Sequence, residues 1–168
     1  MAIVIDATAA GASSNSYTTL ADAETYFESR LHKSDWTSAS DADKNIAIVW
    51  ATRLLDELID WEGYIYTTTQ ALRWPRSGVT DSDGELLDKD TIPQFLVNAV
   101  SEYGMWLIDE DRTTDSDTAG FKKIKVDVIT LEIDKYDKPA QIPPSVLNML
   151  VPYGNSINSS QTRYLVRQ

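Results

Sequence analysis

Residues 41–62 carry the sequence feature that most limits the fold, a run of apolar residues at helical spacing. Apolar side chains that recur every three or four positions lie on one face of an α-helix. In this run the apolar residues at that spacing are Ile46, Val49, Trp50, Leu54 and Leu58. Ser40 is a suitable N-cap before the run, and Gly63 is a suitable stop after it. The segment therefore predicts a long amphipathic helix that needs other elements to cover its apolar face.

Three further segments are expected to be helical and can provide that cover. The first runs from Leu20 to His32, with Thr19 as N-cap and Asp22 three residues later. Its apolar face comprises Leu20, Ala23, Phe27 and Leu31. Another begins near residue 91 and ends at the acidic residues that start at Asp109. Its apolar face comprises Phe95, Leu96, Ala99, Val100, Tyr103 and Leu107. A short final helix is expected at 144–150, after two prolines.

Residues 121–136 show a different period, in which apolar and polar residues alternate. Such alternation is typical of a β-strand with one covered face. The phase breaks at Ile129, so the pattern predicts two short strands, or one long strand with a bulge at 128–129. Residues 33–40 are expected to form a loop from which Trp36 folds back onto the core. The predicted fold class is mainly α, a small helical bundle with a minor β element at about 121–136.

The net charge of −11 is unevenly distributed along the 168 residues. Residues 151–168 contain two arginines and no acidic residue, which leaves −13 on residues 1–150. A domain this acidic repels the nucleic-acid backbone, because affinity for that backbone comes mainly from Lys and Arg. An acidic body with a mildly basic tail indicates that the two parts meet different partners.

The last residues of the chain are too polar to belong to a core. Residues 154–168 are polar up to Tyr164-Leu165-Val166, and fully extended they reach about 45 Å at roughly 3.3 Å per residue. Such a tail is either disordered or pairs with another chain. We therefore expect a helical domain at 1–153 and an extended C-terminal arm at 154–168. No apolar run approaches the roughly 20 residues that cross a bilayer, and no signal peptide is evident.

The residues that carry enzyme chemistry are sparse, and no catalytic constellation is recognised. His32 is interpreted as a cation near a helix C-terminus rather than as a general base. Asp56, Glu57 and Asp60 are interpreted as a solvated helix face rather than as an acid–base pair. Neither a phosphate-binding loop nor a nucleophile-elbow pattern is present, and the chain has no cysteine. We expect a protein that is not an enzyme and has no cofactor.

Two other patterns have a functional and a structural interpretation. Residues 81–85 resemble part of a calcium-binding loop. However, Val79 stands where the first carboxylate of that loop is needed, and Asp90 stands where a bidentate Glu normally binds, so a plain turn without metal is preferred. Five Trp and eight Tyr can form a base-stacking surface, although core packing is the preferred interpretation. The candidate nucleic-acid contacts are Arg73, Trp74 and Arg76.

Several short segments together match a known family pattern. They are SNSY at 14–17, TLADA at 19–23, ATRLLD at 51–56, ALRWPRSGV at 71–79 and LVPY at 150–153. The chain resembles a family of small tailed-phage proteins that are often labelled DnaT-like single-stranded-DNA-binding proteins. These are also similar to the head–tail connector, or adaptor, proteins of long-tailed phages. The resemblance covers most of the chain, and the Trp-Pro-Arg segment is its most specific part.

The resemblance implies a structural adaptor that forms a homo-oligomeric ring, commonly of twelve subunits, beneath the portal of the virion. Such a ring joins the capsid to the tail as a DNA passage, without specific DNA binding, after synthesis in the host cytoplasm. Its implied partners are the portal protein and tail-side connector or tail-terminator proteins, with no membrane. The arm would bind the portal through Arg163, Tyr164, Leu165, Val166 and Arg167. The alternative is a single-stranded-DNA-binding accessory protein.

Overall fold

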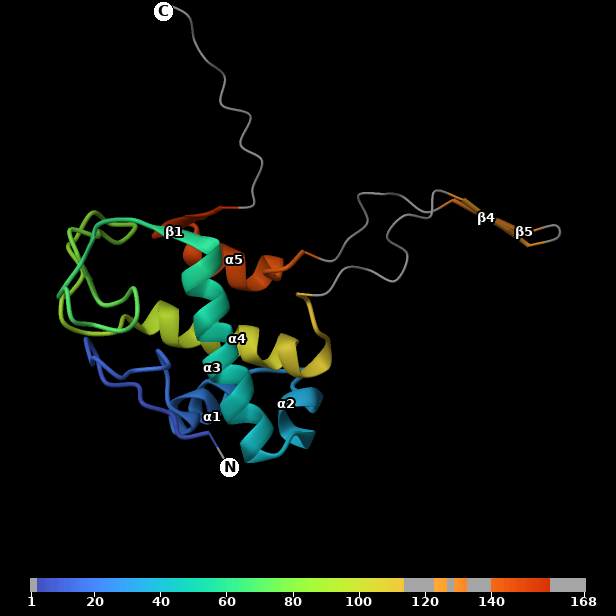
Figure 1. Cartoon of the computed structure of the whole chain (residues 1–168), viewed down its shortest axis with the longest axis horizontal. Helices are drawn as coiled ribbons and strands as arrows, with labels where there is room; N and C mark the ends of the chain where they lie inside the picture. The colour runs from blue at the N-terminus through green and yellow to red at the C-terminus, as the bar shows by residue number, and fades with distance from the viewer. Residues whose placement is uncertain (1–2, 114–122, 127–128, 133–139, 158–168) are drawn as a thin grey trace, which may run out of the picture.

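Helices form the body of the molecule, as Figure 1 shows. The computed structural model describes residues 3–113, 123–126, 129–132 and 140–157. The helices are α1 (Leu20–Glu28), α2 (Ser34–Ser38), α3 (Asp41–Leu58), α4 (Gln94–Asp109) and α5 (Pro144–Leu150). The strands are β1 (Ile59–Trp61), β2 (Tyr64–Ile65), β3 (Arg76–Ser77), β4 (Lys123–Val126), β5 (Ile129–Glu132) and β6 (Gly154–Ser156). The strands in these ranges form small antiparallel pairs, β1–β6, β2–β3 and β4–β5. The fold is therefore mainly α with minor β, as predicted.

Helix α1 begins where its capping residues predict and ends before its apolar pattern does. The Thr19 side chain accepts a hydrogen bond from the Asp22 N–H, and the Asp22 carboxylate accepts one from the Thr19 N–H. The helix ends at Glu28, and Arg30 then donates to the carbonyl groups of residues 31 and 32 as the chain turns. Leu31 is 80% exposed, and His32 lies beyond the helix with a φ of 54°. The predictions that both belong to α1 are wrong, because the turn takes them off its apolar face.

Residues 33–40, which were expected to form a loop, contain the short helix α2. Trp36 of this helix is 1% exposed, and its ring centroid lies 4.5 Å from that of Phe27 in α1. The prediction that Trp36 folds back onto the core is confirmed. This contact joins α2 to α1, and α2 also packs beside α4.

The buried face of α3 contains Leu54 of the predicted stripe, but smaller side chains line its N-terminal half. Ala47, Ile48 and Ala51 are buried, whereas Ile46 is 51% exposed. Gly104 of α4 lies against this face, since a Cβ added there would stand 3.6 Å from the Ala47 carbonyl carbon. The distance between packed helices depends on the side chains at their contact, so small residues allow a close crossing. The prediction that Ile46 faces the core is wrong, because the crossing at Ala47 rotates it outward.

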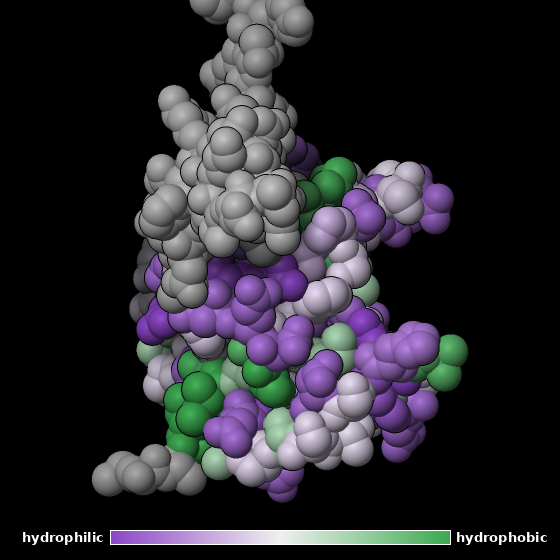
Figure 2. Space-filling view, turned by 90° about the vertical axis from the view of Figure 1, so that its right-hand side faces the viewer, coloured by the Kyte–Doolittle hydropathy of each residue, from purple (hydrophilic) through white to green (hydrophobic). Residues whose placement is uncertain are grey.

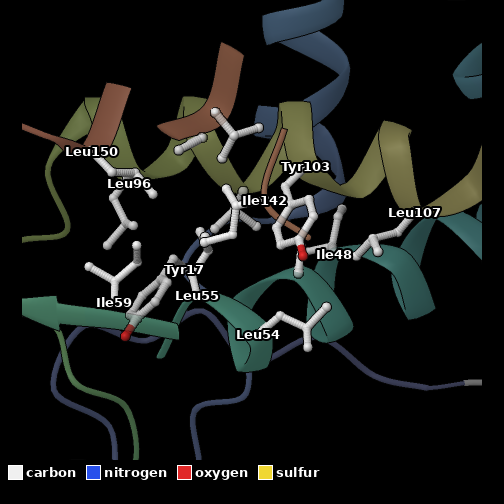
Figure 3. Close-up of a cluster of buried hydrophobic side chains, with 14 of the residues drawn as sticks. Tyr17, Ile48, Leu54, Leu55, Ile59, Leu96, Tyr103, Leu107, Ile142 and Leu150 are labelled. Atoms are coloured by element: carbon white, nitrogen blue, oxygen red, sulfur yellow. The ribbon is translucent and has the colours of Figure 1, made fainter. Parts of the chain in front are cut away.

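Helix α4 presents the apolar face that its sequence predicts. Leu96, Ala99, Val100, Tyr103 and Leu107 are all buried, and Phe95 packs against them. Figure 3 shows how Tyr103 and Leu96 lie among side chains from α3, β1 and α5. The Tyr103 hydroxyl donates to the carbonyl group of Gln141 at 2.9 Å, which ties the segment before α5 to the core. Burial of this apolar surface is the main force that holds the helices together.

The alternating segment forms two short strands rather than one bulged strand. β4 and β5 pair antiparallel with each other, and the register opposes Val126 to Ile129. The choice between the two predicted forms is thus settled in favour of the hairpin. Residues 121–122, 127–128 and 133–136 of the predicted β element lie outside the described residues.

The end of the described chain returns to the body. α5 occupies residues 144–150, as predicted, and β6 then pairs with β1. The Ile157 N–H donates to the carbonyl group of Leu58 at 2.9 Å, at the C-terminal end of α3. Residues 154–157, where the arm was expected to begin, thus contact the body. The five residues of the proposed portal contact, at 163–167, lie outside the described residues. Among the helices that the structure describes, none has the length and apolarity needed to cross a membrane.

Candidate functional site

Trp74, the central residue of the Trp-Pro-Arg segment, is enclosed in the core. Its side chain is 1% exposed, and the peptide bond to Pro75 is cis. The Trp74 ring lies edge-on to Trp61 and to Phe95, with centroid separations of 5.7 and 5.6 Å. A ring packed in this way stabilises the core but leaves no face on which a base can stack. Its placement argues against the hypothesis that Trp74 contacts nucleic acid.

The two arginines that flank Trp74-Pro75 differ in their access to solvent. Arg76 is 8% exposed, and its guanidinium donates to the carbonyl groups of Glu62 at 2.6 Å and Gly63 at 2.7 Å. Burial lowers the pKa of Arg76, and the nearby charge of Arg73 lowers it further. Arg76 therefore ties β3 to the turn between β1 and β2 and is not available to phosphate. Of the three candidate nucleic-acid contacts, only Arg73 is exposed.

A buried polar contact beneath this segment was not predicted. The Tyr17 hydroxyl donates to Asp56 Oδ1 at 2.5 Å and accepts a hydrogen bond from the Trp74 N–H at 3.1 Å. Asp56 Oδ2 accepts a hydrogen bond from the Arg73 N–H at 3.1 Å. Burial raises the pKa of Asp56, and burial together with the Asp56 charge raises the pKa of Tyr17 well above its usual value. The interpretation of Asp56 as part of a solvated face is wrong.

Tyr17→Phe is expected to lower the free energy of unfolding by about 1–3 kcal/mol, because it leaves the Trp74 N–H and one Asp56 oxygen without their partner. Urea unfolding followed by tryptophan fluorescence measures this. Tyr64→Phe, at a side chain that is 79% exposed, is the matched control and should change stability by less than about 0.5 kcal/mol. Equal effects at the two positions would contradict the structural role of Tyr17.

A groove with an apolar floor and an acidic rim lies between α2, α3 and α4, with a volume of about 480 Å³. Its floor is formed by Ile46, Ala47, Trp50, Leu107 and Ile108. Its rim carries the carboxylates of Asp35, Asp43 and Asp109. None of these carboxylates takes part in an ion pair among the described residues. Figure 2 views the side on which α2 lies in Figure 1, and its lower half shows hydrophobic surface next to hydrophilic surface. We call the groove between α2, α3 and α4 the acidic-rimmed groove.

A second hollow, of about 420 Å³, lies beside the Trp-Pro-Arg segment. It is lined by two exposed arginines, Arg53 of α3 and Arg73. Asp56 and Glu57 line the same hollow, so its positive charge is partly compensated. Sequence reasoning missed Arg53 because, on the outer face of this helix, only the carboxylates were considered as functional groups.

The residues considered for metal or acid–base chemistry do not gather into a site. In residues 81–85 the Asp81 carboxylate accepts hydrogen bonds from the N–H groups of Asp83 and Glu85, both at 2.9 Å, which makes a turn. No group of three or more potential metal ligands occurs among the described residues. His32 is exposed and lies in the turn after α1.

The fold and its surface define a small, acidic, mainly α domain with an apolar groove. The family model described as "Putative DnaT-like ssDNA binding protein" matches residues 1–168, and the chain belongs to this family. The resemblance to the DnaT-like family inferred from the short segments is therefore confirmed. No curated protein and no solved structure matches the chain.

Proposed function

We propose that this protein is a structural, non-catalytic adaptor of a tailed-phage virion, placed in a ring between the portal and the tail. The acidic-rimmed groove carries this proposal, because its apolar floor and three carboxylates suit a basic and apolar protein segment. The net charge of −11 also supports a protein-binding role, because it opposes binding to the phosphates of nucleic acid. Both properties fit a protein that assembles with other proteins.

The acidity also suits a DNA passage. A ring of about twelve copies multiplies the charge of one subunit, and a negative lumen repels phosphate and lets DNA slide without sticking. The partners in this proposal are other copies of the chain, the portal protein, and tail-side connector or tail-terminator proteins. The portal contact is assigned to residues 163–167, because this segment combines two arginines with three apolar side chains and no acidic residue.

Mass photometry with purified portal rings tests the adaptor role. The full chain is expected to give a ring-sized complex with the portal. A chain that ends at residue 157 should stay folded, because β6 and its pairing with β1 are retained, and should lose the complex. Circular dichroism of the shortened chain provides the folding control. Portal binding that survives the deletion would overturn the assignment of residues 163–167.

The second candidate is single-stranded-DNA binding, which the family description and the hollow with Arg53 and Arg73 favour. Two arginines release few counterions, so they supply only a weak affinity, and this affinity falls modestly as salt rises. Adding labelled single-stranded DNA to the same measurement separates the two candidates. The adaptor role predicts no binding in about 50 mM salt. Binding that is lost in Arg53→Ala/Arg73→Ala would instead favour the DNA-binding function.

A further inference from the structure

We propose that the acidic-rimmed groove is the docking site for the C-terminal segment of this same chain, residues 163–167. The inference goes beyond the adaptor role, because it concerns only the groove and the segment and needs neither portal nor DNA. In this assignment the basic C-terminal segment binds the acidic surface of its own chain.

The groove has surface that an occupant would cover. Ile46 is 51% exposed although it is an aliphatic residue of α3, and Trp50 and Ile108 are only half-buried. The carboxylates of Asp35, Asp43 and Asp109 surround these side chains, and no ion pair neutralises them among the described residues. A matching segment therefore has apolar residues for the floor and cationic residues for the rim.

Residues 163–167 have this composition. Their sequence is Arg163-Tyr164-Leu165-Val166-Arg167, and residues 158–168 as a whole contain no acidic residue. Three adjacent apolar side chains can cover Ile46 and Trp50, while an arginine at each end can reach the carboxylates. The charge of the segment is +2, whereas the net charge of the chain is −11. Its complementarity to the acidic rim is therefore a property of this segment and not of the chain as a whole.

The end of the described chain lies within reach of the groove. The hydrogen bond from the Ile157 N–H to the Leu58 carbonyl group places residue 157 at the C-terminal end of α3. Trp50 is eight residues earlier on the same helix, about 12 Å along its axis at 1.5 Å per residue. Five residues lie between 157 and 163, so the six residue-to-residue steps span up to about 20 Å when the backbone is extended. The segment of the same copy therefore reaches the groove, and a tether of this length gives it a high effective concentration there.

Occupancy of the groove has a consequence for assembly. The same five residues are assigned above to the portal contact, so the groove and the portal would compete for them. The groove would then hold the segment in the free protein and release it when a portal is present.

Disulfide cross-linking of the full-length chain tests the docking, because the native sequence has no cysteine. Ser38→Cys places a thiol in the groove lining and keeps all three carboxylates, and Thr162→Cys places one beside Arg163. Under mild oxidation we expect this pair to form a disulfide at least tenfold faster than the control pair Ser82→Cys with Thr162→Cys. Ser82 is also exposed, and its turn lies between β3 and α4, on the other side of α3 from α2 in Figure 1.

Charge reversal in the segment tests whether its arginines contribute to docking, which the proximity of the two cysteines alone does not show. Arg163→Glu/Arg167→Glu in the Ser38→Cys/Thr162→Cys chain should slow the disulfide about five- to tenfold, while the double lysine variant should retain most of the rate. A product of one-chain mass supports docking within the same copy, whereas a product of two-chain mass would overturn it in favour of exchange between copies. Equal rates for the groove and control pairs, or no effect of charge reversal, would overturn the proposal and leave the portal assignment untouched.

Discussion

Glu102→Ala is expected to lower the free energy of unfolding by about 3–5 kcal/mol at pH 7, because it breaks a buried ion pair. Glu102 is 3% exposed, and its carboxylate accepts hydrogen bonds from Arg30 Nε and Arg30 Nη2, both at 2.7 Å. The Tyr26 hydroxyl and the Trp106 indole also donate to it, at 3.1 and 3.3 Å. The substitution leaves four donors from α1, α4 and the turn after α1 without their shared acceptor. Urea unfolding at pH 7 measures the loss.

An ion pair whose carboxylate is largely exposed provides the control. Glu24 pairs with Lys44 at 2.7 Å, but the Glu24 side chain is 46% exposed, so Glu24→Ala should cost less than about 1 kcal/mol. If Glu102→Ala lowered the free energy of unfolding no more than Glu24→Ala does, the prediction that the buried ion pair is important for stability would be wrong.

The pH dependence provides an independent check on the same pair. Burial alone raises the pKa of Glu102, but the hydrogen bonds and charge of Arg30 outweigh burial and hold this pKa below its usual range. The folded state then binds a proton less readily than the unfolded state, so the pair stabilises the fold above the ordinary Glu pKa of about 4.3. This contribution is lost as pH falls below that value through the lowered pKa of the folded state. The stability difference between the native chain and Glu102→Gln should therefore narrow on acidification.

Local signals in the sequence predicted the elements whose causes are local. The Thr19 and Ser40 caps accept hydrogen bonds from N–H groups three residues later, as their spacing predicts. The apolar face of α4 was predicted because its large side chains mark it clearly. The strands at 123–132 were predicted because alternation is itself a property of neighbouring residues.

The features that sequence reasoning missed depend on contacts between distant residues. The close crossing of α3 and α4 rests on Ala47 and Gly104, whose small side chains carry little hydrophobic signal. Ile46 was therefore predicted in the core, whereas it lines the acidic-rimmed groove. Likewise, a carboxylate on a helix normally faces solvent, and only the arrival of Tyr17, 39 residues away in sequence, buries Asp56. No spacing rule along the chain reports either contact.

Trp74→Ala is expected to lower the free energy of unfolding by about 3–5 kcal/mol, the usual cost of removing a fully buried aromatic side chain. The ring fills the space between Trp61 and Phe95, and Phe95 in turn stacks on Tyr153 with centroids 3.7 Å apart. A cavity at this point weakens the contact of β1 with the start of α4 and with the segment after α5. Urea unfolding monitored by circular dichroism measures the loss, since the substitution also removes a fluorophore.

Arg73→Ala is the control that separates a structural from a DNA-binding role of this segment. Arg73 is exposed and only its backbone N–H is bonded to Asp56, so its truncation should change stability by less than about 0.5 kcal/mol. If Trp74 stacked on bases, Trp74→Ala would instead leave the unfolding free energy unchanged and reduce affinity for single-stranded DNA by about 1–3 kcal/mol. The two outcomes have opposite patterns. A large loss of stability in Trp74→Ala, together with an unchanged stability in Arg73→Ala, would assign the Trp-Pro-Arg segment to the core. Any nucleic-acid contact must then lie elsewhere on the surface.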